Sequence, residues 1–218
     1  MALGPRAAAD RTGRRLGRMA DVIVFDLYGV IARTQSPEAI RRIEKTAGVS
    51  GGSAAAFWQA YWECRPAYDA GQDAAAYWAA VADRLGAAFP DVPALVEADL
   101  DSWIDVDEAM VELVVELADR GRTLGLLSNI IGELVPRFET RHGEWLSRFA
   151  ALTYSCRIGV AKPDPRAYLI CAERLGVAPG EVLFFDDREV NVVAAREAGM
   201  RAEVFRSPAQ VRELVRLP

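Results

Sequence analysis

The chain has 218 residues, which is the size of one domain or of one domain with a large insertion. Its content of 51% hydrophobic and 26% charged residues is typical of a globular protein and excludes a disordered or fibrous chain. The formal net charge of −5 argues against nucleic acid as a partner, because neutralising phosphate groups requires a basic surface. Of the 26 basic residues, 24 are arginine and two are lysine, Lys45 and Lys162.

The cysteines, the histidine and the first residues narrow the possibilities further. The three cysteines are widely spaced without a C-x-x-C motif, which predicts free thiols in a cytoplasmic protein and no zinc site. The single histidine, His142, argues against a Ser-His-Asp triad. No apolar run approaches the roughly 18 residues of a membrane span, so no membrane partner is expected. Residues 1–19 are basic and lack the apolar stretch of a signal peptide, so we predict a disordered tail there.

The first predicted strand, Val22–Leu27, is an apolar run that does not alternate with polar residues, as in strands buried on both faces of a parallel sheet. Residues 36–105 then show no convincing strand pattern. Helices are predicted there around 37–47, 53–65, 73–86 and 92–104, with Gly and Pro turn signals between them. The simplest interpretation is an all-helical insertion between the first strand and the rest of an α/β core.

Strands and helices alternate after residue 105. Apolar runs predict strands at Thr123–Leu127, Ala150–Tyr154, Val182–Phe185 and, with a weaker pattern, Ala202–Phe205. Helical periodicity marks Glu108–Arg120, Asp164–Leu175, Asn191–Ala198 and Pro208–Leu217. This alternation predicts an α/β fold, a three-layer Rossmann-like core with a parallel sheet. We assign residues 20–35 and 106–218 to this core and residues 36–105 to the helical insertion.

Polar side chains follow the predicted strands in turn. Asp26 ends the first strand, Ser128 and Asn129 end the second, a turn containing Lys162 follows the third, and Asp186 and Asp187 end the fourth. Each could simply cap a helix or a turn. In parallel sheets, however, the carboxyl ends of the strands share one edge, where ligands bind. Three aspartates gathered there would repel one another unless a cation lay among them, and Mg²⁺ suits such oxygen ligands best.

Four segments carry a family resemblance: FDLYGV, LLSN, AKPDP and FFDDREVN, in this order. With them the chain resembles the haloacid dehalogenase superfamily of hydrolases over about residues 20–206. The resemblance is to members with a helical cap inserted after the first strand. Among these it looks like the phosphatases, such as the glucose-1-phosphate phosphatase type and the amino-terminal phosphatase of epoxide hydrolase. It implies an enzyme that hydrolyses a small phosphorylated substrate, a sugar phosphate or a similar metabolite.

The resemblance also implies catalytic roles. Asp26 would be the nucleophile, attacking phosphorus to form an aspartyl-phosphate that water then hydrolyses. Ser128 would bind a phosphoryl oxygen, helped by the backbone N–H of Asn129. Lys162 would neutralise the nucleophile and the transferring group. The scarcity of lysine supports this, because a lysine in that one motif is an unusual choice for this chain.

A magnesium site is implied as well. Asp26, the backbone carbonyl of Tyr28 and Asp187 would bind the ion, while Asp186 and Asn191 would orient its waters or the lysine. Tyr28, which also lies where substrate would bind, departs from the phosphatase pattern, because most of these phosphatases carry a second aspartate there to protonate the leaving group. A slow enzyme, or one that prefers good leaving groups, is therefore expected.

Tyr28 keeps two alternatives open. It resembles 2-haloacid dehalogenases, in which the aspartate attacks carbon without a metal, and Arg33 could then bind a carboxylate or halide. The paired Asp186 and Asp187 oppose this alternative, because those dehalogenases resemble Ser-Ser-Asn at that motif. A catalytically weak member acting as a binding protein is the other alternative. Neither monomer nor homodimer is favoured, since nothing in the sequence marks an interface.

The predicted insertion is rich in aromatic residues, which include Trp58, Trp62, Trp78 and Trp103. We expect most of them to form the small core of the cap. One or two, together with Arg65 or Tyr68, are expected to face the cleft and contact substrate.

Overall fold

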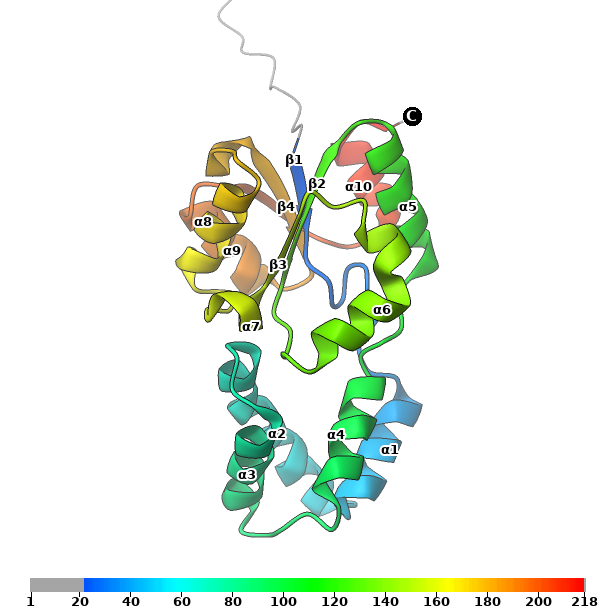
Figure 1. Ribbon diagram of the computed structural model, residues 1–218, viewed down its shortest axis with the longest axis vertical. Coiled ribbons are helices and arrows are strands. Elements are labelled where there is room, and N and C mark those ends of the chain that lie inside the picture. Colours follow the sequence, from blue (N-terminus) through cyan, green and yellow to red (C-terminus); the bar gives the residue numbers. More distant parts are fainter. Residues whose placement is uncertain (1–21, 218) are drawn as a thin grey trace, which may run out of the picture.

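Five parallel strands form one sheet in the computed structural model, which describes residues 22–217 (Figure 1). The strands are β1 (Val22–Phe25), β2 (Thr123–Ser128), β3 (Ala151–Tyr154), β4 (Val182–Asp186) and β5 (Arg201–Val204). Their order is β3-β2-β1-β4-β5, and every neighbouring pair is parallel. The predicted basic tail, residues 1–19, lies outside the described residues.

Helices cover both faces of the sheet (Figure 1). One face carries α5 (Glu108–Asp119), α6 (Leu134–Leu146) and α10 (Pro208–Leu214), and the other carries α8 (Pro165–Arg174) and α9 (Glu189–Glu197). Because side chains alternate along a strand, Ile23 and Phe25 pack into the first of these layers while Val22 and Val24 pack into the second. The predicted three-layer Rossmann-like core is thereby confirmed.

Four helices lie between β1 and α5 in the chain. They are α1 (Pro37–Ala47), α2 (Gly52–Asp69), α3 (Ala74–Leu85) and α4 (Val92–Asp101), which we call the helical unit. In Figure 1 this unit sits beyond the carboxyl ends of the strands, with α1 packed on α4 and α2 on α3. Aromatic side chains form much of its interior, since Phe57, Tyr61, Tyr77 and Trp78 are buried. A large hydrophobic interior of this kind holds short helices together where propensity alone would not.

The two chain segments that join the helical unit to the sheet run side by side. The backbone N–H of Arg33 donates to Asp105 O at 2.9 Å, and that of Asp107 donates to Ile31 O at 2.8 Å. Ala32 and Val106 form an antiparallel bridge between them. The chain therefore enters and leaves the helical unit through one paired, two-stranded link.

The structure also shows helices that the sequence pattern did not predict. α6 contains Pro136 and Gly143, which obscured its periodicity, yet Pro136 lies in the first turn, where its missing N–H costs no hydrogen bond. The predicted helix 53–65 continues through Pro66 to Asp69, because Arg65 and Tyr68 in that turn are held by burial. A single further turn, α7 (Ser155–Ile158), follows β3. In the part of the chain that the structure describes, no helix is long and apolar enough to cross a membrane.

Candidate active site

The candidate site lies where the strand order reverses, at the carboxyl ends of β1, β2 and β4, as expected for an open parallel sheet. Asp26 directly follows β1, and its backbone N–H donates to Phe185 O at 2.8 Å. Ser128 ends β2 and Asp186 ends β4. The chain after Asp26 then turns tightly, because the carbonyl of Leu27 accepts from the N–H groups of Ile31 and Ala32.

One lysine lies between two of these aspartates, and we call Lys162, Asp26 and Asp186 the Lys162 cluster. The Lys162 Nζ is 2.7 Å from Asp26 Oδ1 and 2.6 Å from Asp186 Oδ2. Asn129 fixes the backbone of this lysine, since its Nδ2 donates to Lys162 O and its Oδ1 accepts from Lys162 N, both at 2.8 Å. Three separate segments of the chain thus hold one ammonium group in place.

The charges of the Lys162 cluster are unequally compensated. Burial alone would lower the pKa of Lys162, but Asp26 and Asp186 raise it, so the ammonium form persists. Burial likewise favours a raised pKa for Asp186, yet Lys162 and hydrogen bonds from Arg188 N and Asn191 bring its pKa below the usual value. The pKa of Asp26 is raised well above its usual value by burial, which Lys162 only partly offsets. Of the two carboxylates in the cluster, Asp26 is therefore the one whose ionised form a further positive charge would stabilise more.

The residues at this edge fit a hard divalent cation. Asp26, Asp186 and Asp187 each offer a carboxylate oxygen, and these oxygens lie within 4.8 Å of one another. Three carboxylates and Lys162 sum to a charge of −2, which a divalent ion would balance. Both oxygens of Asp186 already accept hydrogen bonds from Lys162, Asn191 or Arg188 N. Asp26 and Asp187 are consequently the carboxylates with capacity to bind a metal.

Gly29 permits the close approach of Asp187 to the turn after β1. It has a φ of 83°, and a Cβ at this position would stand 2.4 Å from Asp187 Oδ2. Any other residue would be strained and would push the carboxylate away. The glycine thus places Asp187 against the backbone that carries the carbonyl of Tyr28.

A cavity of about 540 Å³ opens between these strand ends and the helical unit. Its lining residues on the sheet side include Asp26, Asn129, Lys162, Asp187, Arg188 and Asn191. Those on the helical side include Trp62, Arg65, Pro66, Asp69 and Trp103, with Tyr28 and Thr34 between the two sides. The cavity therefore brings most of the predicted site residues together and adds a second wall.

Some predicted residues lie elsewhere. Ser128 is fully buried and does not line the cavity; its Oγ donates to Asn129 O at 3.4 Å. Asp186 lies behind Lys162, also outside the lining. Arg33 is exposed and does not line the cavity, although its neighbour Thr34 does, which weakens its suggested role in a dehalogenase. Tyr68 is buried in the helical unit, whereas Arg65 does face the cavity.

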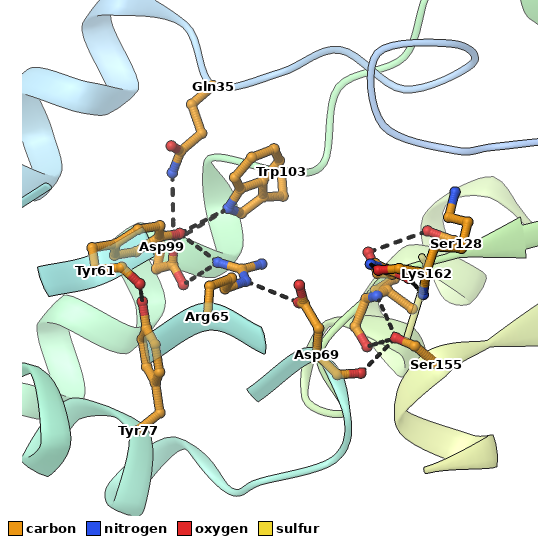
Figure 2. A network of polar contacts seen from close by, with 12 residues as sticks. Gln35, Tyr61, Arg65, Asp69, Tyr77, Asp99, Trp103, Ser128, Ser155 and Lys162 are labelled. Atoms are coloured by element: carbon orange, nitrogen blue, oxygen red, sulfur yellow. Dashed lines mark hydrogen bonds and ion pairs between the residues drawn. The ribbon is translucent and has the colours of Figure 1, made fainter. Parts of the chain in front are cut away.

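The second wall holds its own buried ionic cluster, the Arg65 cluster, formed by Arg65, Asp69, Asp99, Tyr61 and Trp103 (Figure 2). Arg65 Nε donates to Asp69 Oδ1 at 2.9 Å, and Nη1 lies 3.7 Å from Asp99 Oδ2. The Tyr61 hydroxyl donates to Asp99 Oδ1 at 2.6 Å. Asp69 was not among the residues predicted from the sequence, although its i,i+4 spacing from Arg65 on a helix was a usable signal.

Tyr28 lies between the two walls. Its ring packs edge-on against Trp103 at 5.0 Å and Phe138 at 6.3 Å between centroids. Its hydroxyl is buried and has no hydrogen-bond partner among the described residues. Burial raises the pKa of Tyr28 well above its usual value, so the phenol stays protonated and is a weak acid.

Comparison with known proteins assigns the family. The model of the haloacid dehalogenase-like hydrolases matches residues 20–199. The chain belongs to this family and is therefore a hydrolase, as the four sequence segments predicted. A phosphatase of Mycobacterium tuberculosis, MT3486, is 54% identical over 56 residues. This segment covers 26% of the chain and 26% of the relative, so the match spans about a quarter of that relative's length.

Solved structures share the fold. An enzyme of the same family from Bacteroides thetaiotaomicron, bt-2542, in complex with magnesium and inorganic phosphate, superimposes with a TM-score of 0.67. It is 18% identical and covers 85% of this chain and 93% of its own. The L-2-haloacid dehalogenase of Xanthobacter autotrophicus, with chloropropionic acid covalently bound, has a TM-score of 0.63 at 22% identity, covering 91% and 84%. At these identities the likeness concerns the fold alone.

Proposed function

We propose that this protein is a magnesium-dependent hydrolase of a small phosphomonoester, a sugar phosphate or a similar metabolite, acting through an aspartyl-phosphate at Asp26. The observation that carries the proposal is the position of Asp26. It lies on a cavity, beside a buried lysine and within an acidic cluster that suits a divalent ion. The phosphatase among its sequence relatives supports the same chemistry.

In the first step, a carboxylate oxygen of Asp26 would attack phosphorus while the bond from phosphorus to the ester oxygen breaks. Asp26 Oδ1 accepts from Lys162 and from the backbone N–H of Leu27, and these contacts fix the carboxylate at the edge of the cavity. Water would then attack the phosphorus of the aspartyl-phosphate, releasing inorganic phosphate and regenerating the carboxylate. Lys162 would stabilise the negative charge of the phosphoryl group throughout.

Asp26, Asp187 and the carbonyl of Tyr28 would hold the magnesium ion. The bound ion would supply positive charge that shields the nucleophile from the phosphoryl oxygens. Asp186 and Asn191 would act by orienting Lys162, because both Asp186 oxygens accept from Asn191 Nδ2 at 3.0 Å. We assign binding of a phosphoryl oxygen to the backbone N–H of Asn129, which lines the cavity, and to Ser128, whose hydroxyl would first have to leave the carbonyl of Asn129 and turn toward the cavity.

We further propose that residues 36–105 act as a cap over a core formed by residues 20–35 and 106–218. The paired link at Ala32 and Val106 supports this division, since it is a narrow connection between the two parts. A cap would exclude water during transfer and contact the leaving group. Tyr28 would line the path of the leaving group without protonating it efficiently, so esters with good leaving groups should react fastest.

The alternative of a 2-haloacid dehalogenase is favoured by Tyr28 and by no other residue of the site. Such an enzyme would need a partner for the substrate carboxylate or the halide, and Arg33, the residue suggested for this, is not among the residues that line the cavity. The Asp187 side chain, placed beside the nucleophile, would also repel a carboxylate substrate. A catalytically weak binding protein remains the reading if neither reaction occurs.

One set of assays tests the proposed function. The protein should release phosphate from p-nitrophenyl phosphate only with Mg²⁺, and Asp26→Asn should lower the rate more than about 1,000-fold, as loss of a nucleophile does. Asp119→Asn is the matched control, because this exposed aspartate at the end of α5, before β2 begins, pairs with Arg148 and does not line the cavity. Metal-independent chloride release from 2-chloropropionate would overturn the proposal in favour of the dehalogenase. Silence in both assays would indicate the binding protein.

A cytoplasmic location is part of the proposal. It is supported by Cys64, Cys156 and Cys171, which are all free thiols in the structure.

A further inference from the structure

The Arg65 cluster forms the wall that a leaving group would meet. Arg65, Asp69, Trp62 and Trp103 line the same cavity as Asp26, but from the helical unit. Because phosphorus must lie at Asp26, the group that departs from it extends toward these side chains. Their chemistry therefore determines which leaving groups fit.

Arg65 is held firmly in this wall. Its side chain is 7% exposed, and aromatic rings of Tyr61, Tyr68 and Trp103 lie 5.3 to 5.7 Å from the guanidinium carbon. The Tyr61 hydroxyl accepts from Nη1 at 2.5 Å and donates to Asp99 Oδ1. Such a guanidinium is pre-organised, so binding a ligand costs little side-chain entropy.

The backbone of Asp69 is fixed by a contact with the segment that follows β3. Its backbone carbonyl accepts from Ser155 Oγ at 2.5 Å, and the same Ser155 Oγ accepts from Ile130 N at 2.9 Å. This places the end of α2 against the segment that follows β3, as Figure 2 shows. The Asp69 carboxylate thus has a fixed position relative to the strand ends.

Both side chains keep one polar atom for a ligand. The hydrogen bonds and ion pairs found within residues 22–217 engage Nε and Nη1 of Arg65 and Oδ1 of Asp69. Nη2 of Arg65 and Oδ2 of Asp69 are not used by them. A donor and an acceptor on side chains one helical turn apart suit hydroxyl groups, because each hydroxyl both donates and accepts.

The charge of the wall excludes a second anion. Arg65 is paired with Asp69 and with buried Asp99, so the three side chains sum to −1. An additional phosphate or carboxylate there would face uncompensated negative charge. Trp62 and Trp103 add apolar faces that suit the C–H face of a ring.

We propose that Arg65 and Asp69 bind hydroxyl groups of the leaving group, so that the enzyme selects phosphate esters of neutral, polyhydroxylated rings and rejects esters carrying a second anion. This inference rests on the proposed phosphatase function, because it concerns the group that leaves Asp26. It assigns specificity to two residues of the helical unit and leaves the reaction at phosphorus unchanged.

A matched set of substrates tests the proposal on the unmodified protein. myo-Inositol 1-phosphate, cyclohexyl phosphate and myo-inositol 1,4-bisphosphate share a six-membered carbon ring and differ in hydroxyl groups and charge. With Mg²⁺, kcat/KM should be at least about 100-fold higher for the monophosphate of inositol than for cyclohexyl phosphate, because unpaired buried polar groups penalise the analogue. It should also exceed that for the bisphosphate at least 10-fold. Equal rates, or a preference for the bisphosphate, would overturn the inference.

A variant of Asp69 tests whether this residue is responsible for the selectivity between substrates. In Asp69→Asn the ratio of kcat/KM for inositol 1-phosphate to that for cyclohexyl phosphate should fall at least 10-fold. Asp101→Asn is the control, because Asp101 of α4 also pairs with an arginine, Arg137 of α6 at 2.7 Å, but this pair is solvent-exposed and does not line the cavity. A purely structural role for Asp69 would lower both rates together and leave the ratio unchanged, which would contradict the inference.

The two proposals fail in different ways. If p-nitrophenyl phosphate is hydrolysed with Mg²⁺ and Asp26→Asn abolishes this, the proposed function stands whatever the ring substrates show. If no phosphate is released from any of the four compounds, the proposed function fails and the inference fails with it.

Discussion

Two buried ionic clusters face one cavity, and each holds a single cation between two aspartates. In the Lys162 cluster, three segments distant in sequence converge on one ammonium group, with both N···O distances at 2.7 Å or less. In the Arg65 cluster, the guanidinium binds Asp69 within one helical turn and Asp99 at a longer 3.7 Å. The clusters differ in how completely groups of the protein occupy the hydrogen-bond donors of each cation.

The comparison shows why each cluster has its own kind of cation. A lysine is a compact point charge, which suits a site where it must reach two carboxylates at once, here Asp186 and the proposed nucleophile Asp26. An arginine presents a planar fork, so it can bind two groups of the protein and still offer a nitrogen to a ligand. The first arrangement supports chemistry at one atom, and the second supports recognition over a wider area.

Removing the lysine should have the largest effect. Lys162→Met would leave Asp26 and Asp186 buried and unpaired, and breaking a buried ion pair in this way costs about 3–5 kcal/mol. We expect a decrease of that size in the free energy of unfolding, measured by urea denaturation in the presence of a chelator. A loss below about 1 kcal/mol would show that the carboxylates find other partners.

Removing the arginine should lower the free energy of unfolding by less than removing the lysine. In Arg65→Met, Asp99 would still accept from Tyr61 and from the Trp103 indole at 3.2 Å, and Asp69 would face the cavity, where water can reach it. The expected decrease in the free energy of unfolding is about 1–3 kcal/mol, the cost of imperfectly satisfied polar groups. The same denaturation experiment decides it, and a loss equal to that in Lys162→Met would remove the distinction between the clusters.

Magnesium binding should also distinguish the two clusters, and its effect on stability should be the smallest of the three. At ten times its dissociation constant, Mg²⁺ should stabilise the protein by about 1.4 kcal/mol, which raises the melting temperature by roughly 3–6 °C for a chain of this size. Differential scanning calorimetry should show that Asp187→Asn removes this shift and Asp69→Asn retains it. Loss of the shift in Asp69→Asn alone would place the ion in the other cluster.

Much of the fold followed from periodicity and from glycine and proline positions. Apolar runs predicted the first four strands, as is typical of strands in a parallel sheet that helices cover on both faces. The fifth, the edge strand Arg201–Val204, had a weaker pattern because Arg201 and Glu203 interrupt it. The helix around Phe138 escaped, since Pro136 and Gly143 interrupt its pattern and only packing against the sheet stabilises it. The end of α2 escaped similarly, because Pro66 is a common stop signal and only burial of Arg65 and Tyr68 carries the helix past it.

The candidate site, too, could be predicted from the sequence only in part. The gathering of Asp26, Lys162 and Asp187 at one edge could be predicted, because the ends of parallel strands meet there whatever the details of packing. The different places of Asp186 and Asp187 were implied only by the family resemblance and not by the sequence pattern, since they depend on which carboxylate turns toward Lys162 and Asn191 and which lies against Gly29.

The sequence by itself therefore determined the sheet, the helical insertion and the chemistry available at the strand ends, all of which depend on local pattern and on the rules of parallel sheets. Only the tertiary structure decided that Arg65 and Asp69 face Asp26 across a cavity. The docking of a helical unit on a sheet is set by many weak contacts between side chains distant in sequence. No local pattern in the sequence records their sum.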